Sequence, residues 1–257
     1  MRTVVATRYV TPFREGGSLP ALVEGDDQGL YVVKLRGAGQ GPKALVAEWL
    51  AGELARAGGL RVPELVRVEV DPALGRNEPD GEIRDLLKAS AGPNLGLDFL
   101  PGSVTFDPAV GPPPDPEEAA DLVFLDALVT NVDRTPRNPN LLVWHGKLWL
   151  IDHGAALYAH HAWERGADVA AAFPAVKDHV LLPWAGSIAA AAERLAPRLS
   201  PAVEGIVAAL PAAWLAAEPG LPDAAAHRAQ YAGYLTRRLA ARASFVEEAD
   251  RARAALV

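Results

Sequence analysis

The stretch Asn131-Val132-Asp133-Arg134-Thr135-Pro136-Arg137-Asn138 and, shortly after it, Leu150-Ile151-Asp152-His153-Gly154 decide the predicted fold. The first contains an aspartate and an asparagine in the spacing Asp-x-x-x-x-Asn, and in the second Asp152 ends an apolar strand. The residues between them predict a β-hairpin that turns at His145-Gly146. Two carboxylates and one amide at the ends of strands and loops supply the oxygen ligands that Mg²⁺ prefers. We therefore expect a site that holds a divalent ion against phosphate.

Lys34 is the second candidate for this site, because it lies inside an apolar strand predicted over Leu30 to Leu35, after a turn at residues 25–29. Side chains alternate along a strand, so Lys34 shares a face with Leu30 and Val32. An ammonium group on such a face is costly unless an anion lies beside it. The ordinary alternative is a lysine at the edge of a sheet that keeps its charge in water.

A helix is predicted from Pro42 to about Ala57, because proline is favoured in the first turn and Gly58-Gly59 ends the pattern. It offers Glu48 and Glu53 as partners for Lys34. A helical projection places Glu53, and not Glu48, at the centre of the apolar face. The residues alone leave both glutamates open.

The chain of 257 residues is long enough for two lobes around a sizeable core. A proline-rich segment at residues 107–116 predicts an extended crossing, so the boundary is expected between Gly102 and Asp115. Asp115-Pro116-Glu117-Glu118 then predicts a helix start, and the sequence from Ala167 onward has a helical, alanine-rich pattern. The predicted class is α+β and bilobal. A small β-rich N-lobe with one helix spans residues 1–103, a larger and mainly helical C-lobe spans residues 104–257, and together they form one domain.

Composition narrows the class of protein. There is no cysteine, which excludes disulfides and thiolate metal sites and favours a cytoplasmic location. The net charge of −7 argues against nucleic-acid binding. No apolar run approaches the roughly 18 residues of a membrane span.

Several short motifs carry a resemblance to a known family, and they fall within residues 14–160. They are Leu30-Tyr31-Val32-Val33-Lys34, Ala47-Glu48-Trp49-Leu50-Ala51-Gly52-Glu53-Leu54, Gly59-Leu60-Arg61-Val62-Pro63, Asp98-Phe99-Leu100-Pro101-Gly102-Ser103, Asn131-Val132-Asp133 through Asn138, and Ile151-Asp152-His153-Gly154. With these motifs the chain resembles the HipA-like kinases, which have a protein-kinase-like fold and a catalytic loop similar to that of the phosphatidylinositol 3/4-kinases. The resemblance implies an ATP- and Mg²⁺-dependent phosphotransferase.

The resemblance also implies a role for each matching residue. Lys34 would bind the α- and β-phosphates of ATP, and Glu48 would fix Lys34, with Glu53 kept as the alternative. Asp133 would orient and deprotonate the acceptor hydroxyl, while Asn138 and Asp152 would hold Mg²⁺. Lys34, Asp133, Asn138 and Asp152 are accordingly expected to converge in one cleft.

The resemblance implies two further contacts with the nucleotide, both made by backbone. The segment Asp98, Phe99 and Leu100 would hydrogen-bond the adenine, and Gly16, Gly17 and Ser18 would cover the phosphates. The chain departs from the protein-kinase pattern in four places. It has a glycine pair in place of G-x-G-x-x-G, Asn-Val-Asp in place of His-Arg-Asp, and Asp-His-Gly in place of Asp-Phe-Gly, and no Ala-Pro-Glu follows. It is also shorter than the full-length HipA toxins, so we expect it to lack their extra N-terminal segment.

The family implies a Ser/Thr hydroxyl of a protein as the phosphate acceptor. Two alternatives stay open: a kinase of small molecules or lipid headgroups, and a nucleotide-binding pseudokinase that serves as a regulatory module. The presence of Lys34, Asp133, Asn138 and Asp152 argues against the pseudokinase.

Other polar residues near the motifs have simpler interpretations. Asp133 and Asn138, taken singly, would each be read as a turn-capping residue. Asp126, within an apolar helix, is expected to accept hydrogen bonds from the loop backbone. Arg137 is expected at the surface, and Arg134 is left open. His153 is expected to pack or hydrogen-bond within its loop, and the pair His160-His161 is a weak metal signal.

Overall fold

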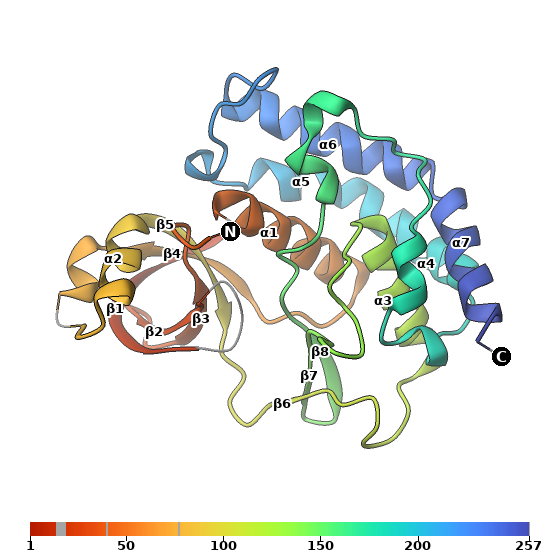
Figure 1. Ribbon diagram of the computed structural model, residues 1–257, viewed down its shortest axis with the longest axis horizontal. Helices are drawn as coiled ribbons and strands as arrows, with labels where there is room; N and C mark the ends of the chain where they lie inside the picture. The colour runs from red at the N-terminus through yellow and green to blue at the C-terminus, as the bar shows by residue number, and fades with distance from the viewer. Residues whose placement is uncertain (14–18, 40, 77, 257) are drawn as a thin grey trace.

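The computed structural model describes residues 1–13, 19–39, 41–76 and 78–256 of the chain. A β-barrel formed from residues 2–98 lies beside a group of helices formed mainly from the C-terminal half (Figure 1). The α+β class predicted from the sequence is confirmed. None of the described helices is both long enough and apolar enough to cross a membrane.

The barrel has five strands, which neighbour each other in the order β1-β2-β3-β5-β4. They are β1 (Arg2–Pro12), β2 (Ala21–Gly25), β3 (Leu30–Lys34), β4 (Leu65–Val70) and β5 (Gly92–Asp98). β1 and β4 run parallel, and the other neighbours are antiparallel. On β3, Tyr31 and Val33 fill the barrel interior. Because strand side chains alternate, Lys34 faces out of the barrel.

A second, three-stranded sheet has the order β6-β7-β8. Its strands are β6 (Val104–Thr105), β7 (Leu141–Trp144) and β8 (Lys147–Leu150), and β7 and β8 form the predicted hairpin. The loop that precedes β7 contains Asp133 and Asn138, and the loop that follows β8 contains Asp152. The hairpin therefore joins the two loops of the predicted site.

The helices are α1 (Gly41–Gly58), α2 (Gly81–Ala89), α3 (Pro116–Leu128), α4 (Ile188–Leu199), α5 (Val203–Ala208), α6 (Ala224–Ala240) and α7 (Ala243–Ala254). α3 begins as predicted, because the Asp115 side chain accepts hydrogen bonds from the backbone N–H groups of Glu117 and Glu118. The described part of residues 1–103 contains α1 and α2, one helix more than the sequence predicts for the N-lobe, and Ile83 and Leu87 of α2 pack into the barrel core.

The prediction of a helical pattern from Ala167 onward was wrong before Ile188. Between β8 and α4 the described chain forms short 3₁₀ turns, at Tyr158–His161, Trp163–Arg165, Pro174–Asp178 and Leu182–Trp184. Most of its hydrogen-bonded backbone N–H groups close single 3₁₀ turns, and a few bond to remote partners; for example, the Val180 N–H donates to the Arg134 carbonyl. Tertiary contacts here override the helix propensity of alanine and leucine.

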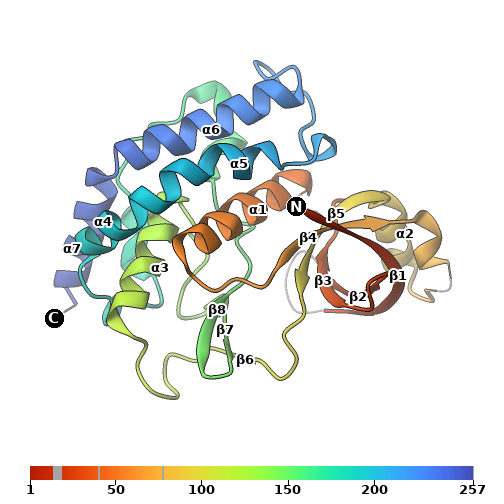
Figure 2. The same cartoon turned by 180° about the vertical axis from the view of Figure 1, so that it is seen from behind.

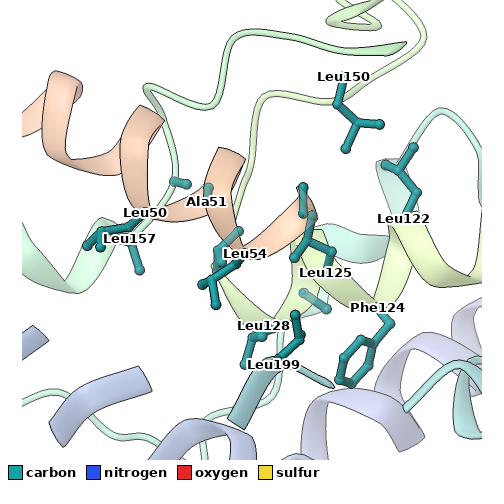
Figure 3. Close-up of a cluster of buried hydrophobic side chains, with 14 of the residues drawn as sticks. Leu50, Ala51, Leu54, Leu122, Phe124, Leu125, Leu128, Leu150, Leu157 and Leu199 are labelled. Carbon is teal, nitrogen blue, oxygen red and sulfur yellow. The ribbon is translucent and has the colours of Figure 1, made fainter. Parts of the chain in front are cut away.

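α1 lies between the barrel and the C-terminal helices, as two opposite views show (Figures 1 and 2). Its side chains Leu50, Ala51 and Leu54 join a core formed with α3, β8 and α4 (Figure 3). Burying one leucine contributes roughly 1.5–3 kcal/mol. Burial therefore fixes α1 against the helices, while its Glu48 faces β3.

Candidate active site

Lys34, Glu48 and Asp152 meet, although they come from β3, α1 and the loop after β8. The Lys34 Nζ lies 2.7 Å from Glu48 Oε2 and 2.6 Å from Asp152 Oδ1. Lys34 is 8% exposed and Glu48 is fully buried, whereas 47% of the Asp152 side chain is exposed. The cluster is thus closed on the side of α1 and open to solvent at Asp152.

Glu48, and not Glu53, is the partner of Lys34. Glu53 contacts Arg56 instead, at 3.4 Å. The helical projection misled because α1 is buried around nearly its whole circumference from Leu45 to Gly52. An apolar face therefore does not identify the side of the helix that faces β3.

Three donors hold the Glu48 carboxylate. Lys34 donates to it, the His153 backbone N–H donates to Oε2 at 2.6 Å, and His153 Nδ1 lies 3.4 Å from Oε1. Burial alone would raise the pKa of Glu48, but the charge of Lys34 and the bonds from His153 outweigh it and lower the pKa to about 2. Burial would likewise lower the pKa of Lys34, but the charges of Glu48 and Asp152 raise it. Both groups are therefore charged at neutral pH.

Asp133 and Asn138 also meet, within one loop. The Asn138 side-chain amide donates to Asp133 Oδ2 at 2.9 Å. The Asn140 amide donates to the Asp133 carbonyl at 2.9 Å and to Oδ2 at 3.3 Å, and the Asp133 N–H donates to Asn131 Oδ1 at 3.2 Å. The loop thus fixes the Asp133 carboxylate through side-chain amides and leaves Asn138 exposed.

One residue, Arg134, ties the Asp133 loop to the Asp152 loop. Its Nη1 donates to the Asn140 carbonyl at 2.5 Å and to the Ile151 carbonyl at 3.4 Å. The Ile151 N–H donates to the same Asn140 carbonyl at 3.1 Å. The carbonyl of Asn140 is therefore a shared anchor for both loops.

A comparison with models of protein families identifies the family to which this chain belongs. A family model described as HipA-like kinase matches residues 7–243. The chain belongs to the HipA-like kinase family. This membership supports a kinase-type phosphotransferase and confirms the resemblance found in the sequence.

Among solved structures, this HipA-like kinase is similar to the crystal structure of the Helicobacter pylori proinflammatory kinase CtkA. The similarity covers 98% of both chains, with a TM-score of 0.57 and 13% sequence identity. At this identity the likeness shows the fold alone. No curated protein matches the sequence.

The resemblance assigns the segment Asp98, Phe99 and Leu100 to adenine binding. In this HipA-like kinase, two of its three backbone N–H groups already donate to other parts of the chain. The Asp98 N–H donates to the Glu64 carbonyl and the Phe99 N–H to the Leu30 carbonyl, each at 2.9 Å. The Leu100 carbonyl accepts from the Ser103 N–H and hydroxyl, which leaves the N–H of Leu100 and the carbonyls of Asp98 and Phe99 as the groups to consider for a base. Gly16, Gly17 and Ser18 lie outside the described residues.

Sequence reasoning missed a buried charge network behind the Asp133 loop. Asp126 was expected to accept from loop backbone, but it accepts from the side chains of Asn131, Arg134 and His179. Arg134, left open, is 1% exposed, and Arg137 is exposed as expected. A carboxylate within the apolar α3 was the one available signal, because a buried charge requires a partner.

A second buried arginine, Arg238 of α6, also supports α3. It is 1% exposed and donates to the carbonyls of Leu128, Ala127, Val169 and Ala171. The first two are carbonyls at the C-terminus of α3, which favours a cation. Arg238 thus holds the end of the helix from which the Asp133 loop starts.

His153, His160 and His161 have structural partners. His153 bonds to Glu48, as expected for a residue that fixes its loop. His160 is buried, and Tyr231 Oη lies 3.2 Å from its Nδ1, while its Nε2 lies 3.1 Å from His161 Nε2. Among the residues that the structure describes, no group of three or more His, Cys, Asp or Glu side chains is arranged to hold a metal ion.

The backbone around the two loops is strained at four non-glycine residues with positive φ. They are Thr130 at 53°, Asn140 at 50°, Asp152 at 54° and Leu157 at 59°. The Leu157 N–H donates to the Val129 carbonyl, at the start of the Asp133 loop. Such conformations cost about 1–3 kcal/mol each and persist only where the surrounding contacts enforce them.

Proposed function

We propose that this HipA-like kinase transfers the γ-phosphoryl group of ATP to a Ser or Thr hydroxyl of a protein. The observation that carries the proposal is the contact of the Lys34 ammonium with both Glu48 and Asp152. A buried cation fixed by a helix carboxylate, next to a solvent-exposed carboxylate, is what binding of a metal-bound triphosphate requires. In this proposal the barrel acts as a smaller lobe, the helices act as a larger lobe, and the nucleotide binds between them.

Each residue then has a defined role. Lys34 binds the α- and β-phosphates, and Glu48 holds its ammonium in place. Asp152 and the Asn138 side-chain oxygen bind Mg²⁺, which prefers oxygen ligands and keeps water or phosphate in its remaining positions. The donor set fits this ion: Asn138 donates its Nδ2 to Asp133, which leaves Oδ1 for a metal, and Asp152 is half exposed. Bound Mg²⁺ would neutralise charge on the phosphates.

The chemistry is a displacement at the γ-phosphorus. The acceptor hydroxyl oxygen forms a bond to the γ-phosphorus, the bond from that phosphorus to the β–γ bridging oxygen breaks, and ADP leaves. The hydroxyl proton passes to Asp133. Because Asn138 and Asn140 both donate to Oδ2, Oδ1 is the oxygen that takes the proton.

A transfer assay tests this function. The protein is incubated with γ-labelled ATP and Mg²⁺, together with casein, histone and a lysate as protein acceptors and, separately, phosphoinositide vesicles. We expect label on serine or threonine of a protein, or of the enzyme itself, and none with Asp133→Asn or with EDTA.

Three outcomes contradict the proposal in different ways. Label on lipid alone makes the protein a lipid-headgroup kinase. An ATP- and Mg²⁺-dependent rise in melting temperature without label on any acceptor makes it a pseudokinase. No change in melting temperature with ATP excludes nucleotide binding altogether.

A further inference from the structure

His179 lies in a segment that the proposed chemistry does not use, yet its side chain contacts the network behind the catalytic loop. Its Nε2 lies 3.0 Å from Asp126 Oδ2, and the Leu181 N–H donates to its Nδ1 at 3.0 Å. His179 is 5% exposed and Asp126 is fully buried. The contact therefore forms without competition from water.

The hydrogen bonds determine the tautomer of the ring. Nδ1 accepts from Leu181, so it carries no proton, and the proton lies on Nε2, which donates to Asp126. Burial lowers the pKa of His179 more than the carboxylate of Asp126 raises it. The ring is thus neutral, and it is both an acceptor for its own turn and a donor to α3.

Asp126 passes this contact on to the catalytic loop. Its Oδ2 also accepts from Arg134 Nε at 2.5 Å, and its Oδ1 accepts from Asn131 at 3.0 Å. Arg134 directly follows Asp133, and its own carbonyl accepts from the Val180 N–H at 3.0 Å. Residues 179 and 180 therefore hold Arg134 twice, once through its backbone and once through its guanidinium by way of Asp126.

We infer that His179 is a positioning residue for phosphoryl transfer, which holds Asp133 through Asp126 and Arg134 and so makes catalysis depend on the segment Pro174–Leu182. The inference rests on the proposed function of Asp133. None of the contacts of His179 involves Lys34 or Glu48. Its loss is expected to change the transfer step and to leave nucleotide binding nearly intact.

Two substitutions separate this role from a local one. The amide nitrogen of glutamine reaches about as far as Nε2 of histidine, so His179→Gln keeps the donor to Asp126 and loses the acceptor for Leu181. The amide oxygen of asparagine lies where Nδ1 lies, so His179→Asn keeps the acceptor and loses the donor. If His179 only shapes its own turn, His179→Asn should damage activity less than His179→Gln does. If His179 positions the catalytic loop, His179→Gln should damage activity less than His179→Asn does.

We expect His179→Asn to lower kcat by about 10- to 100-fold, as loss of supporting hydrogen bonds does at other sites. The KM for ATP should change less than about threefold, and His179→Gln should retain kcat within about threefold. Backbone amide hydrogen exchange of residues 131–140, measured without substrate, should accelerate in the asparagine variant only.

The inference is overturned if His179→Asn keeps both wild-type kcat and wild-type exchange, or if His179→Gln is the more damaged variant. Should His179→Asn fail to fold, the glutamine variant decides, since a tenfold fall in its kcat contradicts the inference. A wild-type protein without transfer activity would remove the proposed function, while the exchange pattern would still test the contact.

Discussion

The ammonium of Lys34 lies 2.6 Å from the carboxylate of Asp152, although 118 residues separate them in the chain. Glu48 holds the same ammonium at 2.7 Å. One lysine thus joins the barrel, α1 and the loop after β8. The contacts of this lysine and of the Asp133 loop lead to three predictions, and the buried Arg238 and His160 lead to one more each.

Glu48→Gln and Glu53→Gln form a matched pair on one helix. Neutralising Glu48 leaves a buried ammonium half compensated, which we expect to lower the free energy of unfolding by about 3 kcal/mol and kcat/KM for ATP by about 10- to 100-fold. Glu53→Gln should change neither, because Glu53 contacts only Arg56 among the pairs described here. Urea denaturation and steady-state kinetics measure both. Equal effects from the two variants would contradict the assignment of Glu48.

Asp133→Asn should lose activity without losing stability. Removing a general base costs about 10²–10⁴-fold in rate, whereas the asparagine oxygen can still accept the hydrogen bonds from Asn138 and Asn140. The control is Arg137→Ala, at an exposed position in the same loop, which should keep its activity. The assay is label transfer from ATP, with melting temperature measured in parallel. Full activity in Asp133→Asn would remove this residue from the mechanism.

Asp152→Asn should uncouple Mg²⁺ from ATP binding. A ligand that binds only the folded state raises the melting temperature in proportion to the logarithm of its concentration over Kd. We expect ATP to raise the melting temperature of the wild type more with Mg²⁺ than with EDTA, and to act equally with both in the variant. A magnesium effect that survives in Asp152→Asn would show that the ion is bound elsewhere.

Arg238→Met should destabilise the protein strongly. The substitution keeps most of the apolar stem but removes the donors from four backbone carbonyls. Each buried group left unpaired costs about 1–3 kcal/mol, so we expect a total loss of at least about 3 kcal/mol. The neighbouring Arg237→Met, at an exposed position, should change stability by less than about 0.5 kcal/mol. Chemical denaturation of both variants provides the comparison.

Acid should destabilise the protein through His160. Burial, helped by repulsion from His161 and Lys43, lowers the pKa of His160 from 6.5 to about 3. Between these values the unfolded chain binds a proton and the folded protein does not, so stability is complete above pH 6.5 and falls as the pH drops toward 3. From pH 6.5 to 5 this amounts to about 2 kcal/mol.

His160→Asn tests the acid prediction, because its side-chain oxygen can still accept from the Tyr231 hydroxyl. Urea denaturation at pH 7.5 and pH 5 should show a smaller loss of stability in the variant than in the wild type. Burial also lowers the pKa of His161 and of His179, so the variant should keep part of the dependence. An identical loss in both proteins would show that His160 does not titrate on unfolding.

The parts of the site that could be predicted from sequence are those in which neighbouring residues fix the geometry. Asp133 and Asn138 share one short loop, and Lys34 and Asp152 end strands, so spacing and alternation placed them. The family motif was needed to assign Glu48 as the partner of Lys34. Because α1 is buried on nearly every side, the periodicity of its apolar residues does not show which side faces β3.

The parts that could not be predicted depend on contacts across long separations. His179 meets Asp126 across 53 residues, and Arg238 meets the Leu128 carbonyl across 110. Backbone carbonyls leave no signature in a sequence, so a buried arginine that bonds to them looks like a surface residue. Remote backbone bonds made by Leu157, Val180 and Gly186 also interrupt the chain between β8 and α4, which forms isolated 3₁₀ turns instead of an α-helix.

The positive φ angles of Thr130, Asn140, Asp152 and Leu157 have a consequence for engineering. Glycine adopts such angles freely, so replacing Thr130 by glycine relieves strain at a half-buried position but also loosens the start of the catalytic loop. Directed evolution that selects only for a higher melting temperature would accept such replacements, and the enzymes it yields would have a higher melting temperature and a lower kcat. Selection for both properties should instead leave these four positions unchanged and take its gains from the outer faces of α6 and α7.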